Sequence, residues 1–213
     1  PSPWGVGFPG WHIECSAMSI SEFPHCLDIH CGGIDHIPVH HENEIAQNEG
    51  AGYHNFVNFW VHGEFLILPE KRMGKSEGNA ITIYKMENKN RGRRVHALAF
   101  RFLCLQSHYR KPLSFSWESL EAAYDGLIGF WNTVSRIAYE TKGVGRVIQE
   151  YKKEFLRAIN DDLNTAKSLS ILSELLKSKN KNEDICETVQ YFDSILGLKL
   201  IPTGSLPPEI MRL

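Results

Sequence analysis

A His-His-Glu-Asn-Glu run that begins at His40 could bind a metal ion together with Cys15. If residues 40 to 50 are helical, His40 and Glu44 lie at positions i and i+4 on one face, close enough to share an ion. Zinc accepts thiolate, imidazole and carboxylate ligands in a tetrahedron, so Cys15 could be a third ligand and one position would stay open. The zinc-protease pattern His-Glu-x-x-His is absent, because Ile45 occupies the place of its second histidine. Histidines that merely cap or line a helix are the alternative.

The basic segment 72–76, Arg-Met-Gly-Lys-Ser, could bind a polyphosphate. It follows an apolar stretch at 65–68, which we expect to be a strand, and leads into turn residues at 77–79. Lysine offers a compact charge and loop amides offer donors to phosphate oxygens. A Walker A loop is excluded, because that pattern requires glycine where Pro69 stands. An ordinary basic surface loop is the alternative.

These two motifs and their flanks resemble the cysteinyl-tRNA synthetases, a family of class I aminoacyl-tRNA synthetases. The resemblance runs in order along most of the chain, is most specific in its first third and is weakest at 86–95 and 139–150. The matching segments are Pro9–Met18, Asp28–His30 with Gly32, Gly33 and Asp35, His40–Gln47, Trp60–His62, Arg72–Ser76, Ser107–Arg110 and Asp161–Thr165.

The chain departs from the family at several positions. The family's phosphate loop reads Lys-Met-Ser-Lys-Ser, whereas Arg72 and Gly74 stand here for the first lysine and the first serine. Arg72 keeps the charge with another geometry, and Gly74 removes a hydroxyl and loosens the backbone. Lys75 matches the second lysine. Cys31, in an expected Gly-rich turn, and Glu64 each occupy the place of a usual glycine.

The resemblance implies a two-step reaction. Cysteine and ATP, which carries Mg²⁺, form cysteinyl-adenylate, and the cysteinyl group then passes to tRNA(Cys). One zinc ion per chain would be held by Cys15, His40, Glu44 and a cysteine upstream of residue 1. Size alone separates cysteine from serine by only a few kcal/mol, whereas zinc prefers sulfur to an alcohol oxygen. Zinc would therefore select the substrate thiolate.

The resemblance also implies roles for the phosphate loop. Lys75, helped by Arg72 and with Ser76 beside it, would stabilise charge that builds on the ATP phosphates, without transferring a proton. Met73 would contact ATP as part of the same loop.

Further contacts are expected around the adenylate and the amino acid. Gly32 and Gly33 would allow close backbone approach to the adenylate. Asp35 and His62 would contact ribose or phosphate. Trp11 would pack near the substrate side chain, with a buried core tryptophan as its alternative.

The family begins with a strand that carries a zinc-binding cysteine and with a His-Ile-Gly-His motif, and nothing in residues 1–213 matches either. We therefore expect an internal segment of a longer protein that is inactive alone. The predicted domains are the second half of a Rossmann-like catalytic domain at 1–85, a helical stem-contact region at 86–138, a helical bundle at 139–201 and a linker at 202–213.

Composition agrees with a packed protein, since 42% of the 213 residues are hydrophobic. The net charge of −2 hides basic runs at 91–94 and 177–181, which could contact nucleic acid or simply be solvated. Five irregularly spaced cysteines give no disulfide framework, which favours a reducing, cytoplasmic setting. No run approaches the ~20 apolar residues of a membrane span. We expect a monomer, with Cys26, Cys104 and Cys186 as buried or incidental thiols.

The elements that must position these residues change along the chain. Residues 27–30 and 57–61 read as strands, and in a parallel α/β sheet ligands gather at the carboxyl ends of strands. That edge would hold Asp28, His30, Gly32, Gly33 and His62, with His30 equally acceptable as an ordinary strand-end histidine.

From about residue 95 the spacing of apolar residues becomes helical, with helices expected near 116–139, 147–159, 163–178 and 183–195. Asn164 or Thr165 could cap the third of these. Asp161 and Asp162 are then better explained by the helix N-terminus than by catalysis. The predicted fold class is therefore α/β followed by all-α.

Two alternatives remain for the function. A cysteine ligase of mycothiol synthesis shares this catalytic half but transfers cysteine to an amino sugar. A non-catalytic zinc-binding or cysteine-binding module is more distant, because half of a parallel sheet would expose apolar surface that invites aggregation.

Overall fold

The computed structural model describes residues 2–3, 5–68, 81–88, 97–141 and 143–201. The predicted phosphate loop at 72–76, the basic run at 91–94 and the predicted linker at 202–213 lie outside these ranges. The chain forms two compact units. The first contains residues 1–65 and 109–112, and the second contains 66–108 and 113–213.

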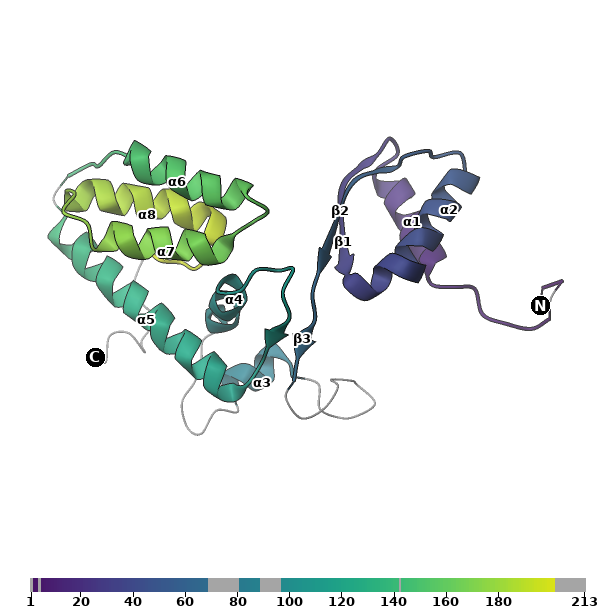
Figure 1. Cartoon of the computed structure of the whole chain (residues 1–213), viewed down its shortest axis with the longest axis horizontal. Coiled ribbons are helices and arrows are strands. Elements are labelled where there is room, and N and C mark those ends of the chain that lie inside the picture. Colours follow the sequence, from purple (N-terminus) through teal and green to yellow (C-terminus); the bar gives the residue numbers. More distant parts are fainter. Residues whose placement is uncertain (1, 4, 69–80, 89–96, 142, 202–213) are drawn as a thin grey trace. The chain divides into compact units, whose positions relative to one another are not determined.

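The first unit is built from helices and a short parallel sheet (Figure 1). Along the chain come α1 (His12–Glu22), β1 (Leu27–Gly33), the 3₁₀-helix η1 (Ile34–His36), the π-helix η2 (Ile37–His41), α2 (Glu42–Gly50) and β2 (Val57–Gly63). Strand β1 pairs with β2 in parallel, from Leu27 opposite Val57 to Gly33 opposite Gly63. Helix α1 packs against α2. A βαβ-type connection thus places the His40 region between the two strands in sequence.

Both predicted strands are confirmed, but each is longer than expected. Strand β1 continues through Cys31 to Gly33 and β2 continues to Gly63. The prediction that Cys31 stands in a Gly-rich turn is therefore wrong, because Cys31 pairs with Val61 inside the ladder. The helix predicted from residue 40 begins as a π-helical turn and becomes α-helical only at Glu42.

The two faces of the β1–β2 pair differ. Side chains alternate along a strand, so Ile29 and Phe59, which are opposite one another in register, share a face. Their side chains are 58% and 68% exposed. The other face carries His30, Trp60 and His62. His30 and Trp60 lie opposite one another in the register, as Ile29 and Phe59 do. One face is therefore apolar and open, and the other is rich in imidazoles.

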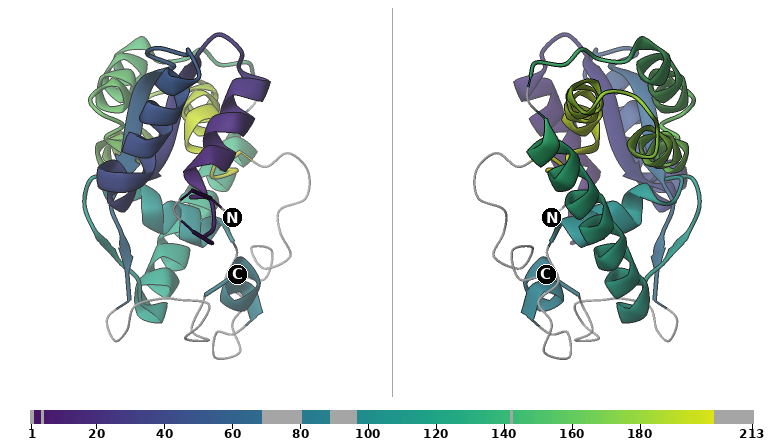
Figure 2. Two further views of the ribbon diagram at one scale, coloured as in Figure 1. Left: turned by 90° about the vertical axis from the view of Figure 1, so that its right-hand side faces the viewer. Right: turned by 90° about the vertical axis from the view of Figure 1, so that its left-hand side faces the viewer.

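The second unit is helical (Figures 1 and 2). A two-residue parallel pair joins β3 (Leu66–Ile67) to β4 (Leu113–Ser114). The helices are α3 (Ile83–Asn88), α4 (Leu98–Leu105), α5 (Trp117–Glu140), α6 (Gln149–Asn160), α7 (Thr165–Leu176) and α8 (Asn182–Leu196). The four long helices predicted after residue 115 are confirmed, whereas β4 and α3 were not predicted and the expected strand at 65–68 shortens to two residues.

The core of the second unit lies among α4 to α8. The rings of Phe155 and Phe192 stack with centroids 3.9 Å apart and are both fully buried. Trp131 of α5 donates a hydrogen bond from Nε1 to the carbonyl of Leu198, 3.1 Å away, after the end of α8. Cys26 and Cys104 are exposed and Cys186 is half-buried, so of the two predicted alternatives, buried or incidental, the structure leaves Cys26 and Cys104 as incidental thiols.

Asn164 caps the start of α7, whereas the acidic pair before it has other surroundings. The side chain of Asn164 accepts a hydrogen bond from the amide of Lys167, which caps the helix as predicted. Asp161 ends α6, and Asp162 Oδ2 lies 3.8 Å from His108 Nε2. Asn164, rather than the aspartates, supplies the side-chain cap.

None of the helices among the described residues is long and apolar enough to cross a membrane. The predicted domain boundaries after residues 85, 138 and 201 stay predictions.

Candidate functional site

Three elements of the first unit bring the predicted metal ligands together. Cys15 comes from α1, His40 from η2 and Glu44 from α2. One potential ligand atom of each residue lies within 4.8 Å of the others. His40 and Glu44 are buried, and Cys15 is half-buried. The residues predicted from sequence spacing therefore converge on one point.

The contact between His40 and Glu44 is close. His40 Nε2 lies 2.7 Å from Glu44 Oε1, one helical turn away. Among the described residues no hydrogen bond of good geometry reaches this buried oxygen, although the distance is short. A buried carboxylate oxygen without a donor is costly, so a positive charge at this point would stabilise it.

The titration behaviour follows from burial. Burial raises the pKa of Glu44 to about 7, because a carboxylate is poorly solvated there. The pKa of the Cys15 thiol is raised by burial and then by the charges of Glu44 and Glu14. The pKa of His40 is lowered by burial and by neighbouring histidines, His12 first. The neutral imidazole, which can ligate a metal, is thus favoured.

This donor set fits zinc. It combines a thiol, an imidazole and a carboxylate, which are the ligand types found in tetrahedral zinc sites. A divalent cation would stabilise the anionic forms of Cys15 and Glu44 that burial opposes.

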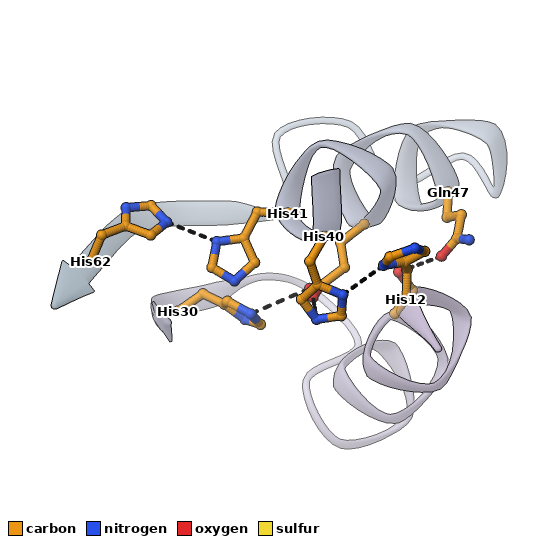
Figure 3. A network of polar contacts seen from close by, with 8 residues as sticks. His12, His30, His40, His41, Gln47 and His62 are labelled. Carbon is orange, nitrogen blue, oxygen red and sulfur yellow. Dashed lines mark hydrogen bonds and ion pairs between the residues drawn. The ribbon is translucent and has the colours of Figure 1, made fainter. Parts of the chain in front are cut away.

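The opposite nitrogen of His40 is also held. His40 Nδ1 lies 2.6 Å from His12 Nδ1, so one of the two rings donates to the other (Figure 3). The indole of Trp11 stacks on His40 with ring centroids 3.5 Å apart. His12 and Trp11 therefore fix the plane of the His40 ring, as groups that contact a metal-binding histidine commonly do.

A polar contact joins the two helices that carry Cys15 and Glu44. The hydroxyl of Ser16, which is buried, donates to Gln47 Oε1 at 3.2 Å. Ser16 follows Cys15 in α1, and Gln47 lies in α2. This bond links α1 to α2 beside the cluster (Figure 3).

A second group of histidines lies beside the first. His41 Nδ1 is 2.8 Å from His62 Nε2, and His30 Nε2 is 3.3 Å from Glu44 Oε2. The pKa of His41 is lowered to about 4, mainly by burial and then by His30, His62 and other neighbouring histidines. His62, predicted to contact ribose or phosphate, is thus already engaged with His41.

The residues that we predicted to contact the adenylate have different surroundings in the structure. A side-chain carbon at Gly32 would lie 2.6 Å from His41 Cε1 and 2.9 Å from His36 Nδ1, so glycine is needed there to admit imidazoles. A carbon at Gly33 would collide with Asp35 Oδ1. Asp35 itself is exposed in η1. Their contacts with an adenylate stay predictions.

Trp11 is 49% exposed, so the alternative of a buried core tryptophan is wrong. The four phosphate-loop residues with predicted roles, Arg72, Met73, Lys75 and Ser76, lie outside the described residues.

Sequence reasoning assigned no role to His12 or His41. The signal for His12 was its place three residues before Cys15, which puts both on one face of a helix. His41 follows His40 directly, and two consecutive helical residues face different directions. This difference points to two separate imidazole positions.

Comparison with known proteins gives two family matches along the chain. Residues 1–125 match the family described as tRNA synthetases class I (C) catalytic domain, and residues 154–199 match the DALR domain. The chain is 44% identical over 200 residues to Cysteine--tRNA ligase 1 of Burkholderia lata, covering 93% of the chain and 41% of the relative. It is 43% identical over 223 residues to Cysteine--tRNA ligase of Treponema denticola, covering 94% and 44%.

A solved structure shares the fold. The LeuRS–tRNA–LeuAMS ternary complex from Agrobacterium radiobacter K84 superposes with a TM-score of 0.57 at 12% identity, over 80% of this chain and 26% of the other. The chain spans less than half the length of the curated relatives named above. The catalytic-domain match covers more than half of the chain. The chain therefore belongs to the class I (C) tRNA synthetase family.

Proposed function

We propose that this chain supplies the cysteine-recognition half of a cysteine--tRNA ligase, which activates L-cysteine with ATP and transfers it to tRNA(Cys). The observation that carries the proposal is the convergence of Cys15, His40 and Glu44 within 4.8 Å. The names of the curated relatives support tRNA, rather than an amino sugar, as the acceptor.

In this proposal Cys15, His40 and Glu44 hold one zinc ion. Bound zinc would supply a further coordination position that favours sulfur over an alcohol oxygen. The chain's own residues do the positioning: Trp11 and His12 hold the His40 ring, and the Ser16–Gln47 bond holds α1 against α2. Trp11 would also line the space for the substrate side chain.

Activation of ATP is proposed for Lys75, with Arg72, Met73 and Ser76 in the same segment. A fixed positive charge near the phosphates stabilises the charge that develops in the in-line attack. Gly32, Gly33 and Asp35 are proposed to border the adenylate. ATP would bring Mg²⁺ with it.

The test is cysteine-dependent ATP–pyrophosphate exchange by the complete gene product that contains residues 1–213. Exchange should depend on cysteine and be far weaker with serine. The Cys15→Ala variant should lose zinc and most cysteine binding, because a thiolate ligand is removed. Cys26→Ala, which changes an exposed thiol outside the cluster, is the matched control. If Cys15→Ala retains zinc and discriminates against serine like the parent, the proposed zinc site is wrong.

The acceptor is tested separately. The same protein should transfer radiolabelled cysteine to tRNA(Cys) in a zinc-dependent and salt-sensitive reaction, since contacts with phosphates weaken as salt rises. Transfer to an amino sugar with no transfer to tRNA would contradict the proposed acceptor and leave the activation step standing.

A further inference from the structure

The first unit has very little permanent positive charge. Residues 1–65 contain no lysine and no arginine, although aspartates and glutamates occur throughout them. The other segment of this unit, 109–112, supplies Arg110 and Lys111. Lysine and arginine are the side chains that stay positively charged at neutral pH. The unit that carries the candidate site therefore has its permanent cations on one short segment.

This segment is held at the carboxyl end of β2. The amide of Glu64, the residue after β2, donates a hydrogen bond to the carbonyl of Tyr109 over 2.8 Å. His62, which contacts His41, lies two residues earlier, or about 7 Å along an extended chain. In a parallel α/β sheet the carboxyl ends of the strands form the edge at which ligands bind. Tyr109 and Arg110 therefore border the edge that carries the imidazoles.

Arg110 is an exposed side chain whose orientation is set by its neighbour. Its guanidinium carbon lies over the ring of Tyr109, 5.1 Å from the ring centroid. This cation–π contact holds the plane of the guanidinium, whose fork of N–H donors matches two oxygens of one phosphate. Lys111 is exposed too, but no aromatic ring of the described residues lies under its ammonium group. Arg110 is thus the better prepared of the two cations for binding an anion.

The exposure of this pair favours an RNA strand over a nucleotide as the ligand. The proposed reaction brings two phosphate-bearing molecules to the chain, ATP and tRNA. A small molecule such as ATP binds in a concave site that buries most of its surface. Single-stranded RNA instead runs across exposed cations and aromatic or guanidinium planes, which bind its phosphates and stack on its bases. Arg110 on Tyr109 offers these two features at the surface.

We propose that Arg110, oriented by Tyr109, binds a phosphate in the unpaired 3′ end of the tRNA and guides that end to the cysteine site. The inference rests on the proposed function, since it names a contact for the acceptor of that reaction. Arg110 contributes to binding of the RNA and takes no part in activation of cysteine. Tyr109 is a positioning residue, because it acts through Arg110.

The test uses the complete gene product that contains residues 1–213. Arg110→Ala should raise the KM for tRNA(Cys) by about tenfold, the effect of losing a hydrogen-bonded charge contact. Cysteine-dependent ATP–pyrophosphate exchange without RNA should keep the parent's rate, which also shows that the variant is folded. In binding measurements, the slope of log affinity against log salt concentration should become shallower by about 0.7, the share of one phosphate contact on a single strand.

A shortened tRNA that lacks its unpaired 3′ end locates the contact. Parent and Arg110→Ala should bind this RNA equally, because the phosphate that Arg110 contacts is gone. An equal loss of affinity for the complete and the shortened RNA would overturn the assignment to the 3′ end. A lower exchange rate of Arg110→Ala in the absence of RNA would assign the residue to ATP and overturn the proposal.

Lys111→Ala is the matched control, since it removes the neighbouring positive charge and leaves the Tyr109–Arg110 contact in place. Its KM for tRNA(Cys) should stay near that of the parent. Tyr109→Ala should raise this KM by a few-fold, whereas Tyr109→Phe keeps a ring under the guanidinium and should match the parent. A KM for Arg110→Ala equal to that of the parent, or to that of Lys111→Ala, overturns the contact.

Failure of this contact is distinguishable from failure of the proposed function. A parent protein that performs exchange but transfers no cysteine to tRNA contradicts the proposed acceptor, and the Arg110 contact with it. A parent that transfers cysteine normally, with Arg110→Ala unchanged, contradicts the Arg110 contact alone.

Discussion

The indole of Trp11 lies almost parallel to the imidazole of His40, with ring centroids 3.5 Å apart and an angle of 13° between the planes. On its edges the same imidazole meets Glu44 through Nε2 and His12 through Nδ1. The ring is therefore fixed on one face and at both nitrogens. Trp11 precedes α1 directly, so the start of one helix orients a ligand at the end of η2.

The Trp11→Ala substitution should weaken zinc binding by about tenfold, the lower end of the effect of removing a group that orients a metal ligand. Chelator competition on the 213-residue chain measures the affinity. Phe8→Ala is the control, because Phe8 is fully exposed. Equal zinc affinities of Trp11→Ala and the parent would mean that the stacked ring does not position His40.

The Gly32→Ala substitution should destabilise the chain by about 1–3 kcal/mol, the usual range for overpacking. The added carbon would lie 2.6 Å from Cε1 of His41, a buried ring whose Nδ1 is already 2.8 Å from His62 Nε2. Urea unfolding measures the change. Gly63→Ala in β2 is the matched control, since nothing lies within 4 Å of its added carbon. Gly32→Ala and Gly63→Ala variants of equal stability would contradict this packing.

Much of the site was predictable because ligand chemistry depends on residue type and helical spacing. The i, i+4 relation of His40 and Glu44 survives even though the chain is π-helical up to His41. The position of Cys15 relative to His40 and Glu44 was harder to predict from the sequence, since it depends on how α1 packs on α2. Tertiary contacts of this kind produce no periodic pattern of residues in the sequence.

The errors have similar physical causes. Cys31, Gly32 and Gly33 are turn residues by local propensity, but parallel pairing with β2 draws them into a strand. The position of a Cβ at Gly32 lies against imidazoles from η1 and η2, a tertiary contact that local propensity does not predict. The long helices of the second unit were predicted well because their apolar faces repeat over several turns.

The Asn164→Ala substitution should destabilise the second unit by about 1 kcal/mol, because the amide of Lys167 loses its side-chain acceptor at the start of α7. Thermal or urea unfolding of the chain measures this difference. Asn180→Ala, at an exposed turn after α7, should change stability by less than about 0.5 kcal/mol. A larger loss for Asn180→Ala than for Asn164→Ala would contradict the cap.

The Lys75→Ala substitution should lower the rate of cysteine-dependent ATP–pyrophosphate exchange by roughly 100-fold or more, the scale of losing one preorganised electrostatic group. The assay uses the complete gene product that contains this chain. KM for cysteine should change much less than kcat, because a contact made only in the transition state leaves ground-state binding intact. Arg72→Ala should cost less, since a guanidinium in place of the family's lysine presents its charge with another geometry.

Zinc content separates this effect from damage to the metal site, because Lys75 is not among the proposed ligands and its removal should leave the zinc content unchanged. Lys111→Ala, which removes an exposed lysine elsewhere, is the matched control and should retain the parent's rate. An exchange rate for Lys75→Ala within a few-fold of the parent would show that this basic segment is a solvated turn. The charge that stabilises the ATP phosphates would then have to come from other residues.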